Sequence, residues 1–460
     1  MGKQSRRRWT VSLLGLGMAL LVSDLARDPL SAFPLTRTHA DRELEKIRRE
    51  HARQQRELTD LSRSGSAEDI ETAERRFAAQ ANERRARSME IADHNPGTYA
   101  KAVALLFVAD QWPESSEGTQ AFERLIAAVD EIEIGAWVRA LNDVQMRTDG
   151  NDRWRPLAAK LVERLQAKPD DPGAALLAAK ACGLVAPDTY VESAPEEFVA
   201  LAELIRKHYA TSPDIYNFSE YVGGTSGYAP AWGAEFEPHV RHILEVNEDR
   251  FVRCTAKFAL ASIARAGGIE RQTEAEQLLE EFLTEFDGKT EYPASSVEEL
   301  KRQFARRILK SIRSHGLSMP APKTVGIDLK GRPMSLADYR GKVVLVSFWA
   351  TWCAPCMQAI PHEKKLLERF GADDFAIVGV NADKKPSRAL EAVAKHGIDW
   401  RSFQAKPDGG SSIADDWHIA GYPTYYLLDR EGVVARTWRE TPPASHLEIA
   451  IETLLKPADR

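Results

Sequence analysis

The feature that most constrains the fold is a pair of cysteines, Cys353 and Cys356, placed where a predicted strand ends and a predicted helix begins. Lys342–Phe348 is mostly apolar, as in a buried strand, and Ala354–Phe370 has helical periodicity. Unpaired N–H groups and the dipole at a helix N-terminus favour a thiolate. We therefore expect Cys353 to be an exposed nucleophile and Cys356 the resolving thiol, with a CxxC turn bringing the two sulfurs within bonding distance.

The pattern around this pair alternates between strands and helices, beginning after Pro320-Ala321-Pro322. A βαβα unit is followed by two strands that are joined by a short turn, and by a last helix. The further predicted elements are a strand at Phe375–Val380, a helix at Pro386–His396, strands at Thr424–Leu428 and Val433–Trp438, and a helix from about Ser445 to Leu455. Residues 320–460 are therefore expected to form an α/β domain.

Three segments of this domain carry a family resemblance. Phe348–Cys356, preceded by Gly341-Lys342-Val343 and followed later by Ala420–Thr424, resembles the TlpA/ResA-like group of thioredoxin-fold proteins, which are exported thiol–disulfide oxidoreductases. The resemblance implies a thioredoxin-like domain with a central mixed sheet flanked by helices. It also implies that clients are proteins with disulfides and that a membrane or periplasmic donor supplies electrons.

The resemblance also implies roles for individual residues. The cysteines would form a redox-active Cys353–Cys356 disulfide. A cis proline would face the dithiol, and the residue before it would pair with a bound substrate segment. The residues that match are Trp352, Ala354 and Pro355 in the active-site turn, and Tyr422 and Pro423 in the substrate-binding segment.

Two other chemistries are disfavoured by the same residues. A structural zinc site needs two further ligands, and the sequence has no second CxxC and no suitably spaced CxxH, so we predict no metal and no cofactor. Peroxiredoxins carry Pro and Thr at the positions of Val346 and Ala350. Peroxidase activity is therefore not expected.

Two acids that related proteins use are missing. Ser347 occupies the position of the buried acid of cytoplasmic thioredoxin, and Ala359 that of a glutamate in the cytochrome c maturation thioredoxins. A carboxylate can assist loss of the proton from the resolving thiol. Water, His362 or Glu363 would have to serve here, and the direction of the redox reaction stays open, with reduction favoured.

The N-terminus resembles an export segment. Lys3 and Arg6–Arg8 precede an apolar run, Trp9–Val22, and Ser31-Ala32 is a candidate cleavage site. Residues 1–32 are therefore predicted to be a signal peptide or a signal anchor. Either alternative places the rest of the chain in the periplasm or another extracytoplasmic space, and the second anchors it to the cytoplasmic membrane.

The chain between these two regions is predicted to be helical. Residues 40–90 are densely charged with both signs and should form a solvated helical stalk or a short coiled coil. Residues 91–315 should form an all-α region of helical hairpins, for which tetratricopeptide-like repeats and irregular hairpins both remain open. The clearest helical stretches are Trp154–Gln166, Gly173–Leu184, Glu196–Tyr209, Val252–Ala266 and Thr273–Phe286.

Two features of the helical region are ambiguous. A Gly- and aromatic-rich stretch between Tyr216 and Trp232 is either a recognition loop or a set of rings packed on neighbouring helices. Cys182 and Cys254 fall on apolar faces and are expected to be buried, although an exported protein could pair them.

The sequence as a whole favours a redox enzyme. Sixty-two Lys and Arg against 68 Asp and Glu give a net charge of −6, so no basic field favours nucleic acid as a partner. The leading hypothesis is an exported thiol–disulfide oxidoreductase acting on client disulfides. The alternative is a helical scaffold or binding module with a thioredoxin-like interaction domain.

Overall fold

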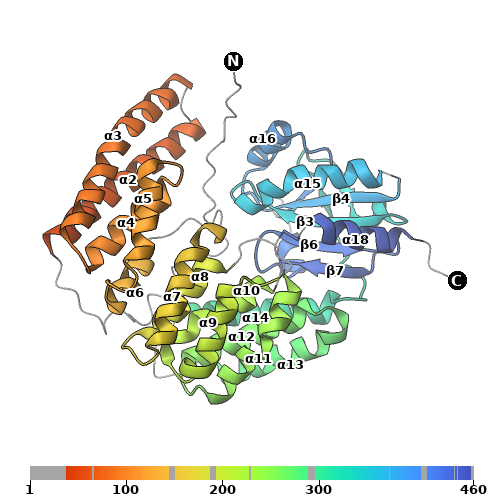
Figure 1. The fold of residues 1–460 in the computed structure, drawn as a ribbon. Coiled ribbons are helices and arrows are strands. Elements are labelled where there is room, and N and C mark those ends of the chain that lie inside the picture. The colour runs from red at the N-terminus through yellow and green to blue at the C-terminus, as the bar shows by residue number, and fades with distance from the viewer. Residues whose placement is uncertain are drawn as a thin grey trace.

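The computed structural model contains a helical region followed by an α/β domain (Figure 1). The helical region ends at His315, and the first strand of the α/β domain begins at Val325. The residues that the structure describes are 38–64, 67–143, 151–186, 193–226, 229–287, 296–371, 373–405, 412–439, 441–442 and 444–456.

The helical region consists of successive helices that pack against their neighbours in sequence. This confirms the predicted all-α class, while the tetratricopeptide-like alternative stays a prediction. The α-helices are α2 (His39–Ser64), α3 (Ala67–His94), α4 (Tyr99–Gln111), α5 (Ser116–Ala127), α6 (Ile134–Asp143), α7 (Arg155–Ala167), α8 (Ala174–Val185), α9 (Glu196–Leu204), α10 (Tyr216–Thr225), α11 (Pro230–Val246), α12 (Arg250–Ala266), α13 (Gln272–Glu285) and α14 (Ser296–His315). Short turns of helix are η2 (Asn151–Trp154), η3 (Ile205–Tyr209), η4 (Pro213–Ile215) and η5 (Ile269–Arg271).

Local capping sets where several of these helices begin. The Ser115 hydroxyl accepts a hydrogen bond from the backbone N–H of Gly118 at 2.9 Å. The Asp249 carboxylate accepts from the N–H groups of Phe251 and Val252 at 3.0 and 3.1 Å. Such side chains satisfy N–H groups that the helix itself leaves unpaired. The helix starts are therefore encoded by nearby residues.

The charged helices α2 and α3 belong to the helical core. Leu44 and Ile47 of α2 are fully buried, and α2 contacts both α3 and α4. Leu44, Met89 and Ala92 lie in the same hydrophobic cluster as the apolar face of α4. The segment therefore differs from the solvated stalk that we expected, because several of its sparse apolar residues are buried against the neighbouring helices.

The Gly- and aromatic-rich stretch packs its rings inward. Phe218 and Trp232 are buried, and the ring centroid of Trp232 lies 4.4 Å from that of Phe198. A Cβ atom on Gly223 would lie 2.8 Å from Ala259, so glycine is needed for the close approach of α10 and α12. Of the two interpretations, packing is the one the described residues support; Gly227 and Tyr228 lie outside them.

The two cysteines of the helical region are buried and not bonded to each other. Cys182 of α8 and Cys254 of α12 are both free thiols with no exposed surface. Burial raises the pKa of Cys254 to about 12, and it also raises the pKa of Cys182. Both therefore act as small apolar residues of the core.

The C-terminal domain is built on a five-stranded mixed sheet in the order β5-β4-β3-β6-β7. β3, β4 and β5 are parallel, whereas β6 pairs antiparallel with β3 and β7. The fold class predicted for this domain is confirmed. Its elements are β1 (Val325–Ile327), β2 (Pro333–Ser335), η6 (Leu336–Tyr339), β3 (Val343–Trp349), α15 (Ala354–Phe370), β4 (Phe375–Asn381), α16 (Pro386–His396), β5 (Ser402–Gln404), α17 (Ile413–Asp416), β6 (Thr424–Leu428), β7 (Val434–Trp438) and α18 (Ala444–Leu455).

The two faces of this sheet have separate cores, because successive strand residues point to opposite faces. Leu345, Tyr425 and Leu427 pack with residues of α15, α16 and α18, and we call this cluster the disulfide-side core. Phe348 and Tyr426 pack with Trp417 in a second cluster, which we call the α14-side core. The position along β3 or β6 therefore decides which core a side chain enters.

The α14-side core is where the helical region meets the sheet. The Tyr426 hydroxyl lies 3.0 Å from the Ser311 hydroxyl of α14, and His315 Nε2 lies 3.1 Å from the Trp417 carbonyl oxygen. The backbone N–H of Ser318 donates to the carbonyl of Val434 in β7 at 2.8 Å. The end of α14 is thus attached to the sheet by both side chains and backbone.

A β-bulge interrupts the pairing of β6 with β7. Leu427 is opposite Arg436 but Leu428 is opposite Val434, so β7 contains one extra residue at this point. A bulge changes which face the following side chains point to.

The predicted export segment lies outside the described residues, so the choice between signal peptide and anchor stays a prediction. Among the helices of the described chain, none combines the length and the apolar content that crossing a bilayer requires.

Candidate active site

The two cysteines of the CxxC segment form a disulfide at the N-terminus of α15. Their sulfurs are 2.02 Å apart, and Cys353 is the N-cap residue, its sulfur accepting the backbone N–H of Cys356 at 3.2 Å. Both cysteines are only 3% exposed, so the expectation that Cys353 is exposed is wrong for this disulfide-bonded state. The residue before the pair, Trp352, is 50% exposed.

The structure brings the predicted substrate segment to this turn. The peptide bond between Tyr422 and Pro423 is cis. The rings of Tyr422 and Trp352 meet edge to face with centroids 5.5 Å apart, and Tyr422 packs on the disulfide-side core, which contains both cysteines. Segments that lie far apart in the sequence, the CxxC turn and the Tyr422–Pro423 pair, therefore form one site.

The remaining residues of the predicted turn begin the helix. Ala354 and Pro355 occupy the first two positions of α15. Proline is well tolerated there because its missing N–H would have no partner within the helix.

Asp383, a residue that the sequence did not single out, accepts hydrogen bonds from the loop before the disulfide. Its carboxylate accepts hydrogen bonds from the Thr351 backbone N–H at 2.9 Å and from the Thr351 hydroxyl at 2.7 Å. Asn381, the last residue of β4, donates to the same carboxylate at 2.8 Å. The signal that could have revealed this contact is the Asn-Ala-Asp run at the carboxyl end of a parallel strand, where loop residues converge on active sites.

A buried carboxyl group occupies the disulfide side of the sheet. Glu363 of α15 is 3% exposed, and its Oε1 accepts a hydrogen bond from the Ser347 hydroxyl at 3.0 Å. Burial raises the pKa of Glu363 to about 7, although hydrogen bonds from Ser347 and Tyr425 act in the opposite direction. The position that lacks an acid in β3 is thus hydrogen-bonded to an acid from the helix.

The second candidate proton acceptor has a different environment. His362 is half-buried, and burial lowers its pKa. Ala359 is buried and contributes no polar group. Glu363 follows Cys356 by seven residues, about two helical turns, so its carboxyl group is further along the same helix rather than beside the sulfur.

Among the described residues, His, Cys, Asp and Glu side chains do not form a group of three or more that could hold a metal ion.

Known proteins resemble this domain. Residues 315–452 match the Redoxin family model. The thiol-disulfide oxidoreductase ResA of Bacillus anthracis is 31% identical over 114 residues, which cover 25% of this chain and 64% of the relative. The thioredoxin-like protein YneN of Bacillus subtilis is 37% identical over 109 residues, or 23% of this chain and 61% of that protein. The chain thus spans less than two thirds of the length of these relatives.

A longer match covers more than two thirds of a relative, and solved structures also resemble the domain. ResA of Geobacillus kaustophilus is 30% identical over 135 residues, covering 29% of this chain and 75% of the relative. The thioredoxin domain of a thiol-disulfide oxidoreductase from Bacteroides vulgatus is 28% identical, with a TM-score of 0.28, and covers 30% of this chain and 98% of its own. On the match to ResA of Geobacillus kaustophilus, the chain belongs, through its C-terminal domain, to the ResA-like family of thioredoxin-fold proteins.

Proposed function

We propose that this chain is an extracytoplasmic thiol–disulfide oxidoreductase that reduces disulfides in client proteins. The observation that carries the proposal is the Cys353–Cys356 disulfide at the N-terminus of α15, beside the cis Tyr422–Pro423 bond. Relatives named thiol-disulfide oxidoreductase support the class of reaction. The apolar run near the N-terminus and its preceding basic residues support export.

The proposed reaction begins from the reduced pair. The Cys353 thiolate attacks one sulfur of a client disulfide, forming a mixed disulfide and releasing the other client sulfur as a thiolate. The Cys356 thiolate then attacks Cys353, releases the second client thiolate and closes the intramolecular disulfide. The client has gained two electrons and two protons, and a partner dithiol has to return them to the enzyme.

Cys353 is assigned as the attacking residue because of its position. As N-cap residue its sulfur receives an N–H hydrogen bond and faces the positive end of the helix dipole, and both favour the thiolate. Cys356 lies inside the first turn. The Tyr422 backbone, next to the cis bond, would pair with the client segment.

The division of labour follows the two regions. We propose that residues 320–460 perform the dithiol chemistry and that residues 91–315 select or position clients, because α14 is attached directly to the sheet. Membrane anchoring through residues 1–32 and a membrane or periplasmic electron donor are part of the same proposal.

The test is a pair of trapping variants in the full chain. Cys356→Ser should accumulate mixed disulfides with client proteins, because the resolving thiol is missing. These complexes should be seen on a non-reducing gel and be absent from a reducing gel. Cys353→Ser is the matched control and should accumulate none. Accumulation in the Cys353 variant instead would reverse the assignment, and accumulation in neither would contradict the proposed activity.

A further inference from the structure

The loop that leads into the substrate segment is held by a helix of the other region. Residues 417–421, which we call the pre-proline loop, connect α17 to the residues of the cis peptide bond. Arg307 of α14 donates from Nη1 to the carbonyl oxygen of Ile419 at 2.6 Å. His315, the last residue of α14, has its Nε2 3.1 Å from the carbonyl oxygen of Trp417. Two backbone carbonyls of the loop are thus contacted by side chains from the helical region.

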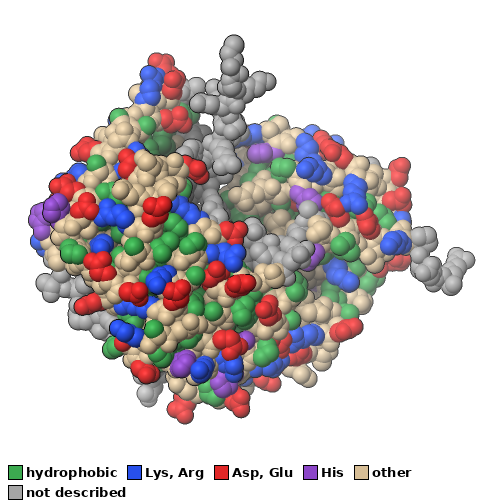
Figure 2. Space-filling view, in the orientation of Figure 1, with side chains coloured by type: hydrophobic (Ala, Val, Ile, Leu, Met, Phe, Trp, Pro, Cys, Tyr) green, Lys and Arg blue, Asp and Glu red, His purple; other side chains and the backbone are tan. Residues whose placement is uncertain are grey.

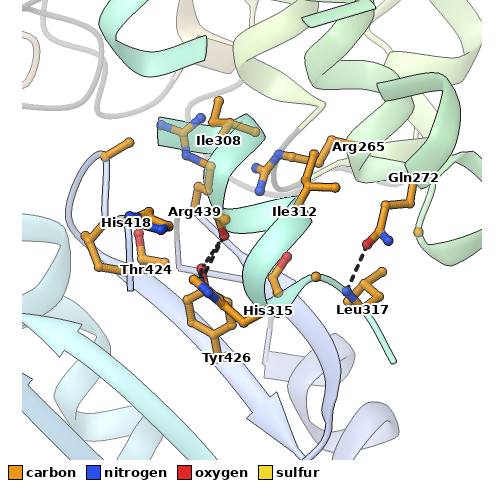
Figure 3. Close-up of a pocket in the computed structure, with 16 residues that line it drawn as sticks. Arg265, Gln272, Ile308, Ile312, His315, Leu317, His418, Thr424, Tyr426 and Arg439 are labelled. Carbon is orange, nitrogen blue, oxygen red and sulfur yellow. Dashed lines mark hydrogen bonds between the residues drawn. The ribbon is translucent and has the colours of Figure 1, made fainter. Parts of the chain in front are cut away.

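The position of His315 is fixed from both sides. A carbonyl oxygen only accepts, so Nε2 carries the ring proton and Nδ1 accepts from the Ser314 hydroxyl at 2.7 Å. Burial lowers the pKa of His315 to about 4, so the ring is neutral near pH 7, as this arrangement requires. Figure 3 shows the ring beside Tyr426 of β6, whose hydroxyl lies 3.0 Å from that of Ser311. The contact with the loop is therefore part of the junction between α14 and the sheet.

The pre-proline loop contains a residue in an uncommon backbone conformation. His418 has a φ of 50°, in the left-handed region, although it is not a glycine. Surrounding contacts have to hold a residue in such a conformation. The neighbours of His418 on both sides, Trp417 and Ile419, are the residues whose carbonyls α14 contacts. The two hydrogen bonds from α14 therefore flank the strained position.

Packing beside this loop is incomplete. A cavity of about 50 Å³, with room for a few water molecules, lies between the helical region and this side of the sheet. Ile419 and Ala420 line it just before the substrate segment, and Thr424 lines it just after. A closely packed interior would leave no such space. Hydrogen bonds from α14 therefore hold the loop at a point where close packing does not.

Arg307 is close to the groups around the substrate segment. Its Nη2 lies 3.9 Å from a carboxylate oxygen of Asp415 in α17. Burial raises the pKa of Tyr422, and the positive charge of Arg307 acts in the opposite direction. The Arg307 side chain is 50% exposed, so it is not a core residue that the fold needs for packing. Its hydrogen bond to the loop is charge-assisted, and such bonds are stronger than neutral ones.

We propose that Arg307 is a positioning residue for client binding, which with His315 fixes the pre-proline loop so that the Tyr422 backbone is presented to an extended client segment. A loop that is already ordered lowers the entropy that binding costs. Figure 2 shows Lys and Arg interspersed with Asp and Glu over the face it presents, so that face offers no field of a single sign to attract clients. The inference rests on the proposed oxidoreductase function and assigns to α14 a part in client recognition.

Reaction of the reduced full chain with two uncharged probes tests the proposal. One probe is a cyclic peptide closed by a disulfide, and the other is 4,4′-dithiodipyridine, which has no peptide backbone. Arg307→Met removes the donors but keeps the aliphatic stem. Its second-order rate constant, measured by stopped-flow, should fall about 5-fold to 20-fold with the peptide, because a charge-assisted hydrogen bond that orders the loop is lost. With dithiodipyridine the rate constant should change by less than about twofold.

Three controls separate positioning from a general effect on the fold. Arg306→Met makes the same change at the neighbouring exposed residue of α14 and should react like the parent with both probes. Arg307→Lys keeps the charge and a donor, and should lose less than the methionine variant. A peptide methylated at the backbone nitrogen beside its cysteine should react equally with parent and Arg307→Met, because it cannot pair fully with the loop. If Arg307→Met does not fold, Arg307→Gln replaces it, since its shorter side chain should show the same selective loss.

The outcomes distinguish this inference from the proposed function. A loss confined to the unmethylated peptide supports the positioning role. Unchanged rates with the peptide, an equal loss with both probes, or an equal loss in Arg306→Met would overturn it. A parent that reacts with neither probe would contradict the proposed oxidoreductase function, and the inference that rests on it would fail as well.

Discussion

The two faces of the central sheet differ in the helices that cover them and in the polar residues that they hold. On the disulfide side, helices of the α/β domain itself cover the sheet, and the face holds the cysteine pair and the buried carboxyl group of Glu363. On the α14 side, α14 of the helical region lies against the sheet, and Arg265 and Arg439 line a cavity between the two regions. The chemistry can therefore be complete within one domain, while the opposite face joins that domain to the helical region.

The largest expected effect tests whether the chemistry belongs to the disulfide side alone. Cys353→Ser should lower reduction of insulin by about 10³-fold or more, because the nucleophile is removed. Turnover in the full chain, measured by the turbidity of precipitating insulin chains, checks this. Retained turnover in this variant would place the reacting group elsewhere.

The next effect concerns the α14 side. Tyr426→Ala should lower the free energy of unfolding by about 3–5 kcal/mol, because a large buried ring that packs on Trp417 is lost. Tyr426→Phe is the control, and removing only its hydroxyl should lower this free energy by about 1 kcal/mol. Urea unfolding measures both. Under native conditions the alanine variant should keep dithiol turnover; a loss as large as that of the cysteine variant would break the separation of the faces.

A smaller effect concerns the disulfide side, where Glu363 should make the free energy of unfolding depend on pH. Glu363 has a pKa of about 7 in the folded chain against 4.5 for an ordinary glutamate, so the folded state binds its proton more tightly than the unfolded state does. The free energy of unfolding should therefore fall as pH rises from about 4.5 to 7, by about 3 kcal/mol. In Glu363→Gln this contribution should disappear. An unchanged pH profile in the variant would show that Glu363 is ionised at lower pH than the geometry indicates.

The same carboxyl group is a candidate positioning residue for the resolving thiol. If it influences proton loss from Cys356, release of a client from a Cys353 mixed disulfide should change its pH dependence in Glu363→Gln, as measured by stopped-flow. His362→Gln tests the other candidate proton acceptor, and we expect it to leave the profile in place. Identical profiles in the parent and in both variants would assign proton transfer to water.

The smallest effect concerns the loop before the disulfide. Asp383→Ala should lower the free energy of unfolding by about 1–3 kcal/mol, because the N–H and hydroxyl of Thr351 lose a charged acceptor. Asp383→Asn keeps one oxygen acceptor and should lose less. Thermal unfolding of the oxidised chain compares the two, and a parent-like alanine variant would show that the loop is held by other contacts.

The long elements of the α/β domain could be predicted from the sequence to within a residue or so. α15 and α16 begin and end where expected, because glycine, proline and the change of periodicity mark their limits. β1, β2 and β5 were missed, since three-residue strands carry too little pattern. In the helical region the class could be predicted, but the burial of Leu44 depends on which neighbours its helix meets.

Some residues of the candidate site could likewise be predicted from the sequence, and others could not. The cysteine pair and the Tyr422–Pro423 segment could be found from local spacing and a family resemblance. The contact of Ser347 with Glu363, the contact of Thr351 with Asp383 and the meeting of Arg265 with Arg439 join residues that only the packed fold brings together. Local periodicity contains no information about such pairs.

The bulge in β7 determines which face of the sheet the side chains at the end of that strand point to. Counting in twos from Val434, which lies in the α14-side core, would send Trp438 to that core and turn Arg439 toward the disulfide. The extra residue reverses this order, so Trp438 packs on the disulfide-side core and Arg439 reaches the cavity. A regular strand that kept Ala435 would exchange the two side chains between the faces, whereas deleting Ala435 would remove the bulge and leave each on its present face. The one extra residue therefore determines the surface of the sheet on which the positive charge of Arg439 lies.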